Sequence, residues 1–530
     1  MVCRGRWAPR AVRSSIRSLY EPAACGRRTR CCVRLPVVSS SAAQPDAAQP
    51  DAAALERARR DVLTRLGPVL PLVRDLGERF AAAGHELALV GGPVRDALLG
   101  RPSPDLDFAT SARPEQSEPI LRGWGTAHWD VGRAFGTIGA QLGPVTVEVT
   151  TYRSDVYDRT SRKPEVSYGD TLEEDLARRD FTVNAMALRL PDLALVDRHS
   201  GLADLARRTL RTPGTPESSF TDDPLRMLRA ARFAGQLGMW VAPEVRSAMT
   251  AMAARLDIVS AERVRDELTK LVLSVDPVRG LRLLVDTGLA EVVLPELPAL
   301  QLEVDEHHRH KDVYEHTMIV LEQAMALETD ASGEVPEPDL VLRLSALLHD
   351  IGKPATRRYE PGGGVSFHHH EVVGAKLTAR RMKALRFDSA TVKDVARLVE
   401  LHLRFHGYGD GAWTDSAVRR YVVDAGPLLS RLHRLTRADV TTRNARRAAQ
   451  LAAAYDDLES RISRLAEQEE LAAVRPDLDG NEIMAALGIP PGREVGAAYN
   501  HLLELRLDRG PLGKEQALAE LRLWWSTHHP

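Results

Sequence analysis

Residues 91–110 read GGPVRDALLGRPSPDLDFAT, and this stretch decides the expected fold of the N-terminal part of the chain. The apolar run ELALV in front of it predicts a strand that enters a tight turn at Gly91-Gly92. VRDALLG then predicts a helix that stops at Gly100, and PDLDFAT predicts a second short strand. Because glycine has no Cβ, backbone N–H groups in such a turn can approach a phosphate closely.

Acidic residues follow the turn at a spacing that suits a cation. Asp105 and Asp107 are two apart on the predicted strand, so their side chains point to the same face. Two carboxylates on one face suit an oxygen-ligated cation such as Mg²⁺, and Glu148 in VTVEVTT is the natural third acid for two-metal phosphoryl transfer. Arg95 can offer a fork of donors to triphosphate oxygens. A lone glycine pair is usually only a turn and a lone Asp-x-Asp usually a solvated loop, but the combination predicts a nucleotide triphosphate site.

The neighbouring segments complete an α/β unit. Apolar residues recur at helical spacing over residues 55–80, and GTIGAQLG with VTVEVTTYR predicts a β-hairpin. TLEEDLARRDFTVNAMALRL begins as a helix at Thr171, with Glu174 three positions later as in a capping box. Its second half, with ALVDR, predicts another strand. Residues 155–168 are charged and lack apolar periodicity, so we expect a mobile loop, and beyond residue 216 the pattern is helical almost throughout.

Composition bounds the class of protein. At 530 residues the chain is long enough for three or four domains, and 44% hydrophobic with 27% charged residues fits a helix-rich globular protein with no membrane-spanning run. With a formal net charge of −2, an RNA partner would have to be held by local arginine patches. Candidate patches, none assigned as a site, are Arg419-Arg420, Arg443 with Arg446-Arg447, and Arg404 beside Tyr408.

The cysteines and the N-terminal zone bear on location. All four cysteines precede residue 33, so the rest of the chain has no disulfide and no thiolate metal site, which suits a reducing cytoplasm. Residues 1–54 are rich in Arg and Ser, then in Ala and Pro, and resemble a transit peptide without an apolar secretory core. We expect a disordered extension or a start codon assigned too far upstream.

Four blocks within about residues 85–275 together carry a family resemblance. GGPVRDALLGRPSPDLDFAT, VEVTTYRSD, ARRDFTVNAMAL and DDPLRMLRAARFAGQLG resemble successive motifs of the bacterial-type (class II) CCA-adding tRNA nucleotidyltransferases, in the polymerase beta superfamily. The resemblance implies a mixed-sheet α/β head and a helical neck. It also implies Mg²⁺-dependent attack of the tRNA 3′ hydroxyl on the α-phosphate of CTP or ATP, with pyrophosphate released. Pro93 departs from the small residue, such as Ala, that is more common in the family, and it removes one N–H from the turn.

The resemblance also assigns site residues. It makes Asp105, Asp107 and Glu148 catalytic, with Asp105 and Asp107 as the Mg²⁺ ligands. It places nine residues at the nucleotide: Gly92, Arg95, Arg179, Asp180, Asn184, Asp223, Arg226, Arg229 and Arg232. Asp223 and Arg226 would read the base, since an acceptor-only and a donor-only side chain three apart on a helix are neighbours on its surface. An ordinary surface ion pair is the alternative for these two. Arg232 falls on the same side as Leu225 and Leu228, so its assignment rests on the resemblance rather than on helix geometry.

Histidines in the middle of the chain have the order H…HD…D. His and Asp from separate helices can converge on one metal, and residues 301–445 resemble the HD superfamily of metal-dependent phosphohydrolases. The resemblance implies that a divalent transition metal, in addition to Mg²⁺, is bound by His316, His349, Asp350 and Asp439. His370 and His402 could complete a further site beside it. An HD fold that has lost its metal and persists as a scaffold is the alternative.

The expected organisation and function follow from these motifs. We expect an extension (1–54), a nucleotidyltransferase head (55–215), a neck with the base-reading helix (216–300), an HD domain (301–445) and a helical RNA-binding body (446–530). The expected partners are tRNA, CTP and ATP, with no membrane. A poly(A) polymerase, an HD phosphohydrolase with an inactive head, and enzymes that add only CC or only A remain open. The HD region favours CCA addition, and the intact 155–168 loop argues against a CC-only enzyme.

Overall fold

A computed structural model describes the chain from residue 52 to residue 529, with short gaps. The described residues are 52–101, 105–153, 169–301, 312–328, 338–361, 364–405, 408, 413–442, 444–469 and 475–529. The chain divides into two units, Met1–Asp46 and Ala47–Pro530, and every described residue belongs to the second. The expected extension and the expected loop at 155–168 therefore lie outside the described residues, apart from residues 52–54, which begin the first helix.

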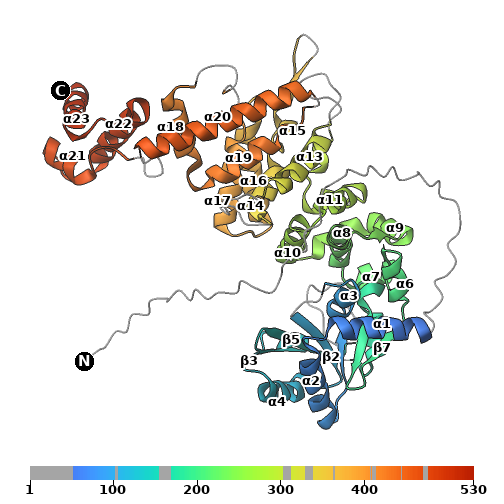
Figure 1. Ribbon diagram of the computed structural model, residues 1–530. Coiled ribbons are helices and arrows are strands. Elements are labelled where there is room, and N and C mark those ends of the chain that lie inside the picture. The colour runs from blue at the N-terminus through green and yellow to red at the C-terminus, as the bar shows by residue number, and fades with distance from the viewer. Residues whose placement is uncertain are drawn as a thin grey trace, which may run out of the picture. The chain divides into compact units, whose positions relative to one another are not determined.

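A seven-stranded mixed sheet forms the head (Figure 1). The strands are β1 (Leu87–Val90), β2 (Asp105–Thr110), β3 (Ala127–Trp129), β4 (Thr137–Leu142), β5 (Val145–Thr151), β6 (Met186–Leu190) and β7 (Ala194–Asp197). Their order is β3-β4-β5-β2-β1-β6-β7, and β2 and β5 pair in parallel while the other neighbours are antiparallel. The predicted strands that became β1 and β2 and the predicted β4–β5 hairpin are confirmed, whereas the single strand expected from residues 186–197 is two antiparallel strands, β6 and β7.

The two faces of the sheet differ because each strand alternates. Leu106, Phe108 and Val147 are buried with apolar residues of α2 (Leu70–Ala82) and α4 (Pro114–Trp124), which cover one face (Figure 1). On the other face, α5 (Leu172–Ala177) covers a small apolar cluster, and Asp107 and Glu148 stay exposed beside it. Each acidic position thus falls between two core positions of its strand.

Helices make up most of the remaining described chain. In the N-terminal part they are α1 (Ala52–Arg65), α3 (Gly92–Leu98), α6 (Gly201–Ala206), α7 (Pro216–Asp222), α8 (Leu225–Leu237), α9 (Pro243–Met252), α10 (Ala261–Val272), α11 (Pro277–Asp286) and α12 (Leu289–Val293). The next group is α13 (Val313–Ala326), α14 (Leu340–Leu348), α15 (Lys353–Thr356), α16 (His370–Ala384), α17 (Ser389–Leu401), α18 (Asp415–Ala425) and α19 (Leu429–Ala438). The last are α20 (Ala445–Glu469), α21 (Gly480–Leu487), α22 (Arg493–Arg509) and α23 (Lys514–His528). This mixed-sheet head followed by helices is the predicted fold class.

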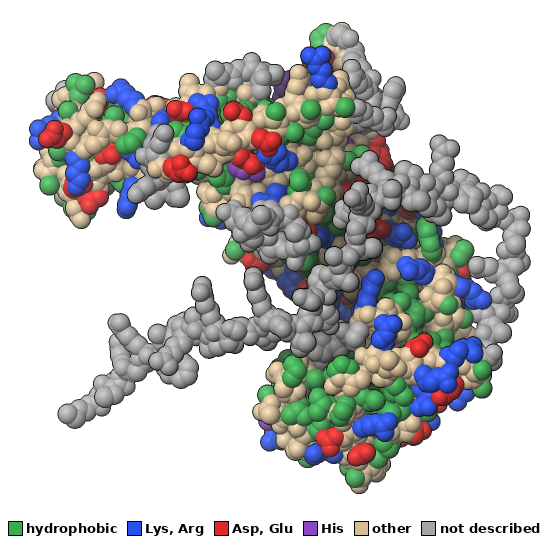
Figure 2. Space-filling view, viewed as in Figure 1, with side chains coloured by type: hydrophobic (Ala, Val, Ile, Leu, Met, Phe, Trp, Pro, Cys, Tyr) green, Lys and Arg blue, Asp and Glu red, His purple; other side chains and the backbone are tan. Residues whose placement is uncertain are grey.

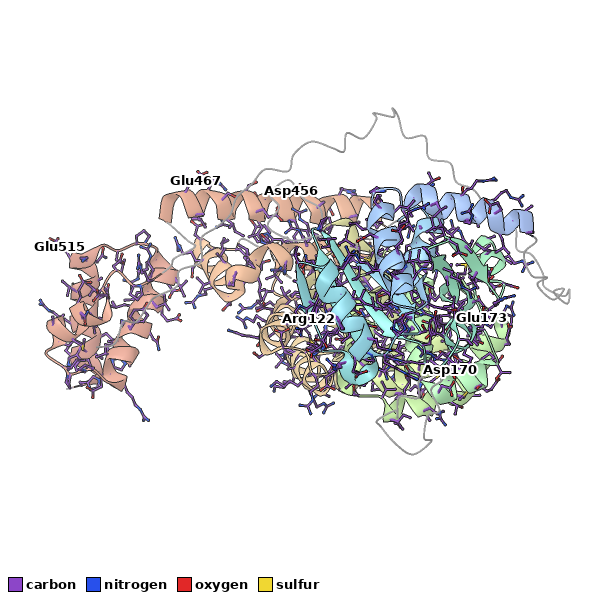
Figure 3. All side chains as sticks on the ribbon, turned by 90° about the horizontal axis from the view of Figure 1, so that it is seen from below. Arg122, Asp170, Glu173, Asp456, Glu467 and Glu515 are labelled. Carbon is purple, nitrogen blue, oxygen red and sulfur yellow. The ribbon has the colours of Figure 1, made fainter. Side chains whose placement is uncertain are left out.

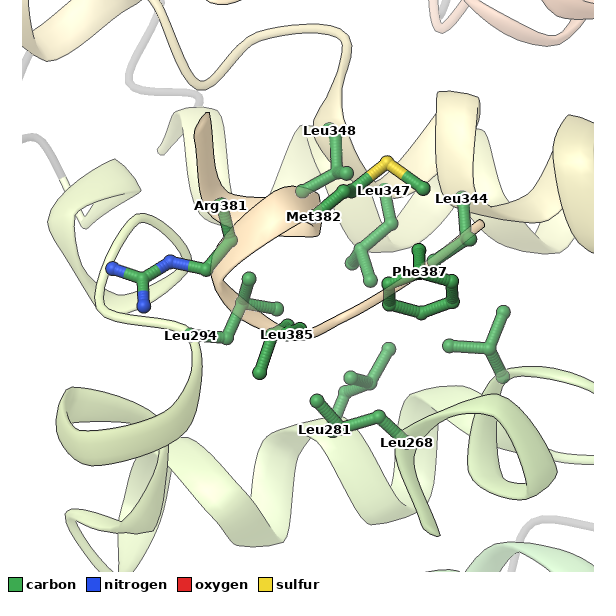
Figure 4. A pocket seen from close by; sticks show the side chains of 11 residues that line it. Leu268, Leu281, Leu294, Leu344, Leu347, Leu348, Arg381, Met382, Leu385 and Phe387 are labelled. Carbon is green, nitrogen blue, oxygen red and sulfur yellow. The ribbon is translucent and has the colours of Figure 1, made fainter. Parts of the chain in front are cut away.

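A buried arginine joins the neck helices to the histidine-bearing helices. Arg343 on α14 donates to the carbonyl oxygens of Val272 and Ser274, at 2.9 and 2.8 Å, just where α10 ends. Its remaining donors bind the buried Glu328 carboxylate, so the charge is paired. Figure 4 shows the small apolar cavity beside this junction, lined by leucines of α10, α11 and α14 and by Phe387.

The last three helices enclose a core of their own. Leu478, Ile483, Leu502 and Leu521 are buried together there. Figure 3 places Glu515 in this group and Asp456 and Glu467 along α20. No helix within the described ranges is long and apolar enough to cross a membrane.

Candidate active site and metal cluster

The register of the sheet brings two of the three catalytic candidates together. Asp107 on β2 is the direct parallel partner of Glu148 on β5, and Asp105 is the partner of Thr146. Side chains at paired positions share a face, so the three carboxylates lie on the same open face, within two positions of each other. Such a set of hard oxygen donors fits one or two divalent cations.

The electrostatics of Asp107 fit a cation-binding role. Burial raises the pKa of its carboxyl above the usual range, and the nearby charges of Glu148 and Asp105 raise it further, while Arg179 and Arg95 oppose the shift. A cation bound beside Asp107 would offset the repulsion between its carboxylate and those of Glu148 and Asp105.

The glycine turn lies at the end of β1, beside the acids' strand. Gly91 has φ 71°, a left-handed conformation that glycine adopts without strain. A Cβ built there would lie 2.8 Å from Nη1 of Arg179, so the arginine approaches the turn closely. Arg179 is held by the buried carboxylate of Asp175, at 2.9 Å. Pro93 sits in the first turn of α3, where an N–H has no partner within the helix.

A polar network behind the turn joins four other candidates. Arg95 is buried and donates to Oδ1 of Asn184 at 2.5 Å and to the Asp96 carboxylate at 2.8 Å. Asn184 donates to Asp180, at 2.9 Å, and Arg229 binds the other oxygen of Asp180 at 2.6 Å. The structure therefore brings Arg95, Asn184, Asp180 and Arg229 into one chain of hydrogen bonds, with Arg95 oriented by protein partners.

The base-reading candidates are arranged differently from the prediction. Asp223 is not on the helix: it is the C-cap of α7 in extended conformation, and α8 begins at Leu225. The expectation of two positions on one helical face is therefore wrong, because Pro224 separates the two helices. Asp223 accepts from Arg263 at 2.7 Å, and Arg226 donates to the carbonyl oxygen of Arg178 at 2.5 Å.

Six residues from five helices converge in the second predicted site. His316 lies on α13, and His370 begins α16. His349 and Asp350 directly follow α14, His402 follows α17, and Asp439 follows α19. They form two groups, in each of which the ligand atoms all lie within 4.8 Å: His316, His349 and Asp439, and Asp350, His370 and His402.

Asp350 connects the two groups instead of belonging to the first alone. Its Oδ2 lies 3.2 Å from Nε2 of His349, and its Oδ1 lies 3.3 Å from Nε2 of His370. A carboxylate with one oxygen toward each group can bridge two cations. The prediction that Asp350 completes the first site is therefore incomplete.

Backbone carbonyls orient three of the histidines toward the centre. Nδ1 of His349, His370 and His402 donates to the carbonyl oxygen three residues earlier, at 2.9, 2.8 and 2.7 Å. This leaves Nε2 as the ligand atom, and Nε2 of His370 and of His402 makes no hydrogen bond although both rings are buried. Burial lowers the pKa of His402 to about 3, which keeps its imidazole neutral. These residues fit a transition metal.

Comparisons with known proteins agree with this geometry. Residues 87–211 match the family "Poly A polymerase head domain", 238–300 match "Probable RNA and SrmB- binding site of polymerase A", and 313–444 match "HD domain". The A-adding tRNA nucleotidyltransferase of Deinococcus radiodurans is 36% identical over 449 residues, which are 84% of this chain and 96% of that protein. The chain belongs to the tRNA nucleotidyltransferases. The CC-adding tRNA nucleotidyltransferase of Thermus thermophilus is 34% identical over 82% of this chain and 93% of its own length.

A solved structure shares the fold. The Bacillus stearothermophilus CCA-adding enzyme in complex with CTP aligns with a TM-score of 0.61 at 23% identity, over 87% of this chain and 98% of the other. At that identity the likeness concerns the fold, a polymerase head followed by helical domains. It agrees with the head and the HD domain described above.

Sequence reasoning missed the residue at the centre of this nucleotidyltransferase's arginine cluster. The Phe233 ring lies 5.1, 5.4 and 4.0 Å from the guanidinium carbons of Arg95, Arg229 and Arg232. Arg232 is also buried against Glu267, at 2.6 Å, so its contacts support the neck packing and the position of Arg229. The sequence did carry a signal for Phe233. It follows Arg226, the first arginine of α8, by seven positions, which is two helical turns along the same face, and an aromatic ring so placed can contact neighbouring arginines.

Three arginines of the candidate basic patches have protein partners in the structure. Arg420 pairs with Glu504 and Asp508, Arg404 pairs with Asp424, and Arg419 is buried against the Leu507 carbonyl. Figure 2 shows acidic and basic side chains interspersed over the C-terminal helices on the face in view. Arg443 lies outside the described residues.

The Asp180–Arg229 pair predicts a pH-dependent stability. Burial opposes the charge of Asp180, but Arg229 and Asn184 lower its pKa from 3.8 to about 2. A depressed carboxyl pKa stabilises the fold above 3.8, and the contribution is lost as pH falls through 2. We expect Asp180→Asn to lower the free energy of unfolding by about 2 kcal/mol at pH 7 and by progressively less below pH 4, measured by urea denaturation. Asp75→Asn, which breaks an exposed pair with Arg79, is the matched control and should cost under about 1 kcal/mol. A deficit for Asp180→Asn that does not change with pH would contradict the assignment.

Proposed function

We propose that this nucleotidyltransferase adds and repairs the complete CCA end of tRNA, using CTP and ATP with Mg²⁺, in the cytoplasm. One observation carries the proposal: Asp107 and Glu148 are paired in register, with Asp105 on the same face, beside the Gly91 turn. Relatives that span most of this chain add A or CC to tRNA, so the family's reaction fits the site.

The residues divide the work of the reaction by position. When bound at the three carboxylates, Mg²⁺ supplies charge neutralisation and activates the attacking hydroxyl. The turn at Gly91-Gly92 and Arg179 hold the triphosphate. The Asp180–Asn184–Arg229 network fixes the sugar and phosphate environment, because its members already bind one another and need little reorganisation.

The choice between C and A falls to Asp223 and Arg226. One accepts and the other donates, so together they can pair with the exposed edge of either base. Their protein partners hold both in place: Arg263 binds the Asp223 carboxylate, and the Arg178 carbonyl and Ser219 accept from Arg226. A protein surface can then take the place of a template.

Nucleotide addition to tRNA that lacks its last three residues tests the proposal. With CTP alone we expect two additions, with ATP alone none, and with both a complete CCA end. Long A tails would support a poly(A) polymerase. Addition of only CC, or of A only to tRNA already ending in CC, would identify one of the split activities. Each outcome is read on a sequencing gel at single-nucleotide resolution.

The two histidine groups favour a second activity in the same chain. We propose that they bind two divalent transition metals and hydrolyse phosphate esters, because Asp350 has an oxygen toward each group. Lys353, 2.9 Å from Oδ2 of Asp350, adds a positive charge beside the cluster that suits a phosphate substrate.

Metal content tests this second site. We expect His402→Ala to remove about half or more of the bound transition metal, since it loses one of three ligands of its group, and to leave nucleotide addition within about twofold. Elemental analysis of the purified protein gives the metal content. His369→Ala is the matched control, because its side chain is 84% exposed and adjacent to a ligand. Equal metal content in both variants would contradict the assignment.

A further inference from the structure

One row of residues crosses the open face of the head sheet at the level of the acids. The register pairs Asp107 with Glu148, Glu148 with Gly139, and Gly139 with Trp129. Directly paired residues put their side chains on the same face. Trp129 on the edge strand β3 therefore shares the face of Asp107 and Glu148.

The indole of Trp129 reaches back over the neighbouring strand. A Cβ built on Gly139 would overlap the indole ring, so the ring lies directly on the glycine backbone. The side chains of Thr137 and Thr150, which have the same parity on β4 and β5, bind each other at 2.9 Å and confirm this face. Trp129 is half-buried on the edge strand, so the residue keeps part of its surface open to solvent.

The Gly91 turn and Asn184, both proposed to bind the nucleotide, lie on the other side of the acids from Trp129. The sheet order is β3-β4-β5-β2-β1-β6-β7, and the Gly91 turn follows β1 while Asn184 precedes β6. In phosphoryl transfer the attacking and leaving oxygens lie roughly in line, on opposite sides of the phosphorus. With the triphosphate over β1, the attacking 3′ oxygen has to come from the side of β5 and β4.

We propose that Trp129 stacks on the terminal base of the RNA acceptor strand and thereby positions its 3′ hydroxyl beside Glu148. The inference rests on the proposed nucleotide addition. Neighbouring strands are about 4.8 Å apart, so an indole lying over β4 is about one strand from Glu148. That separation fits the distance between a base and its own ribose 3′ oxygen. Stacking is tolerant of base identity, as is required of a primer end that changes from the discriminator base to C.

Steady-state kinetics give the first test. We expect Trp129→Ala to raise the KM for tRNA by about 10- to 100-fold, as loss of one stacked base predicts, with the KM for CTP and ATP within twofold. Trp129→Phe should recover most of the loss. Gly139→Ala should act like Trp129→Ala, because the added methyl displaces the ring. His128→Ala, on the same strand but the opposite face, is the matched control and should leave both KM values unchanged.

A terminal abasic nucleotide separates stacking from structural damage. Wild-type protein should bind an RNA minihelix with an abasic 3′ end about 10-fold or more weakly than the intact minihelix, whereas Trp129→Ala should bind the two equally. An equal loss of affinity for the abasic minihelix in both proteins would overturn the inference. A rise in the KM for CTP and ATP instead of the KM for tRNA would also overturn it, and would place the ring at the incoming nucleotide. Wild-type protein that adds no nucleotide at all would refute the proposed function instead.

Discussion

Asp107→Ala should reduce nucleotide addition by on the order of 10³-fold or more, because it removes a carboxylate from the centre of the cation site. Asp107 is the direct partner of Glu148, and Asp105 is two positions away on the same strand, so no other carboxylate on that face can substitute without moving the strand. The loss should appear in kcat/KM for CTP and ATP alike, since the cation is common to both additions. Asp105→Ala should behave in the same way.

The control for this variant is Glu115→Ala, on the surface of α4, which should retain full activity. Thermal unfolding of Asp107→Ala and of Glu115→Ala separates the loss of the carboxylate from a folding defect. Transition-metal content at the histidine cluster should be unchanged in the same preparation. Addition that survives in Asp107→Ala would show that the cation is held elsewhere.

Arg226→Ala should blur the choice between CTP and ATP by roughly 5- to 150-fold, the range of 1–3 kcal/mol for a well-placed pair of hydrogen bonds to one base. Asp223→Ala should have a similar effect, because its carboxylate supplies the acceptor that Arg226 lacks. Competition between the two nucleotides on tRNA ending in C measures the discrimination directly. The rate with saturating correct nucleotide should fall much less than the selectivity.

Arg246→Ala is the matched control for these variants. Arg246 is a neck arginine with an exposed ion pair to Asp286, and its removal should leave discrimination unchanged. Arg263→Ala should give an intermediate effect, since Arg263 holds the Asp223 carboxylate from α10. Full discrimination in both the Arg226 and the Asp223 variants would refute base reading by this pair.

Local patterns predicted much of the head because they specify short-range structure. The glycine turn, the β4–β5 hairpin and the helix start at Thr171 all depend on neighbouring residues, and all three are confirmed. The strand β3 was not predicted, since three residues on a sheet edge carry no readable alternation. Its pairing with β4 depends on the tertiary fold.

The site could be predicted as a set of residues but not as a set of partners. The blocks named Asp180, Asn184 and Arg229, yet only the fold shows that the three bind one another. The order of histidines and aspartates likewise predicted a cluster without showing that Asp350 has an oxygen toward each group. The expected domain boundaries and the individual roles of the site residues stay predictions.

The parallel pairing of β2 with β5 determines which mutations the head can tolerate, because insertions and deletions act differently from substitutions. Loss or gain of one codon in the tight Gly143-Pro144 turn between β4 and β5 would shift β5 by one position against β2. Glu148 would then turn into the helix-covered layer, and a valine would take its place beside Asp107. The hairpin should therefore tolerate many point substitutions but no single-residue insertion or deletion, a difference that a deep mutational scan including indels would reveal.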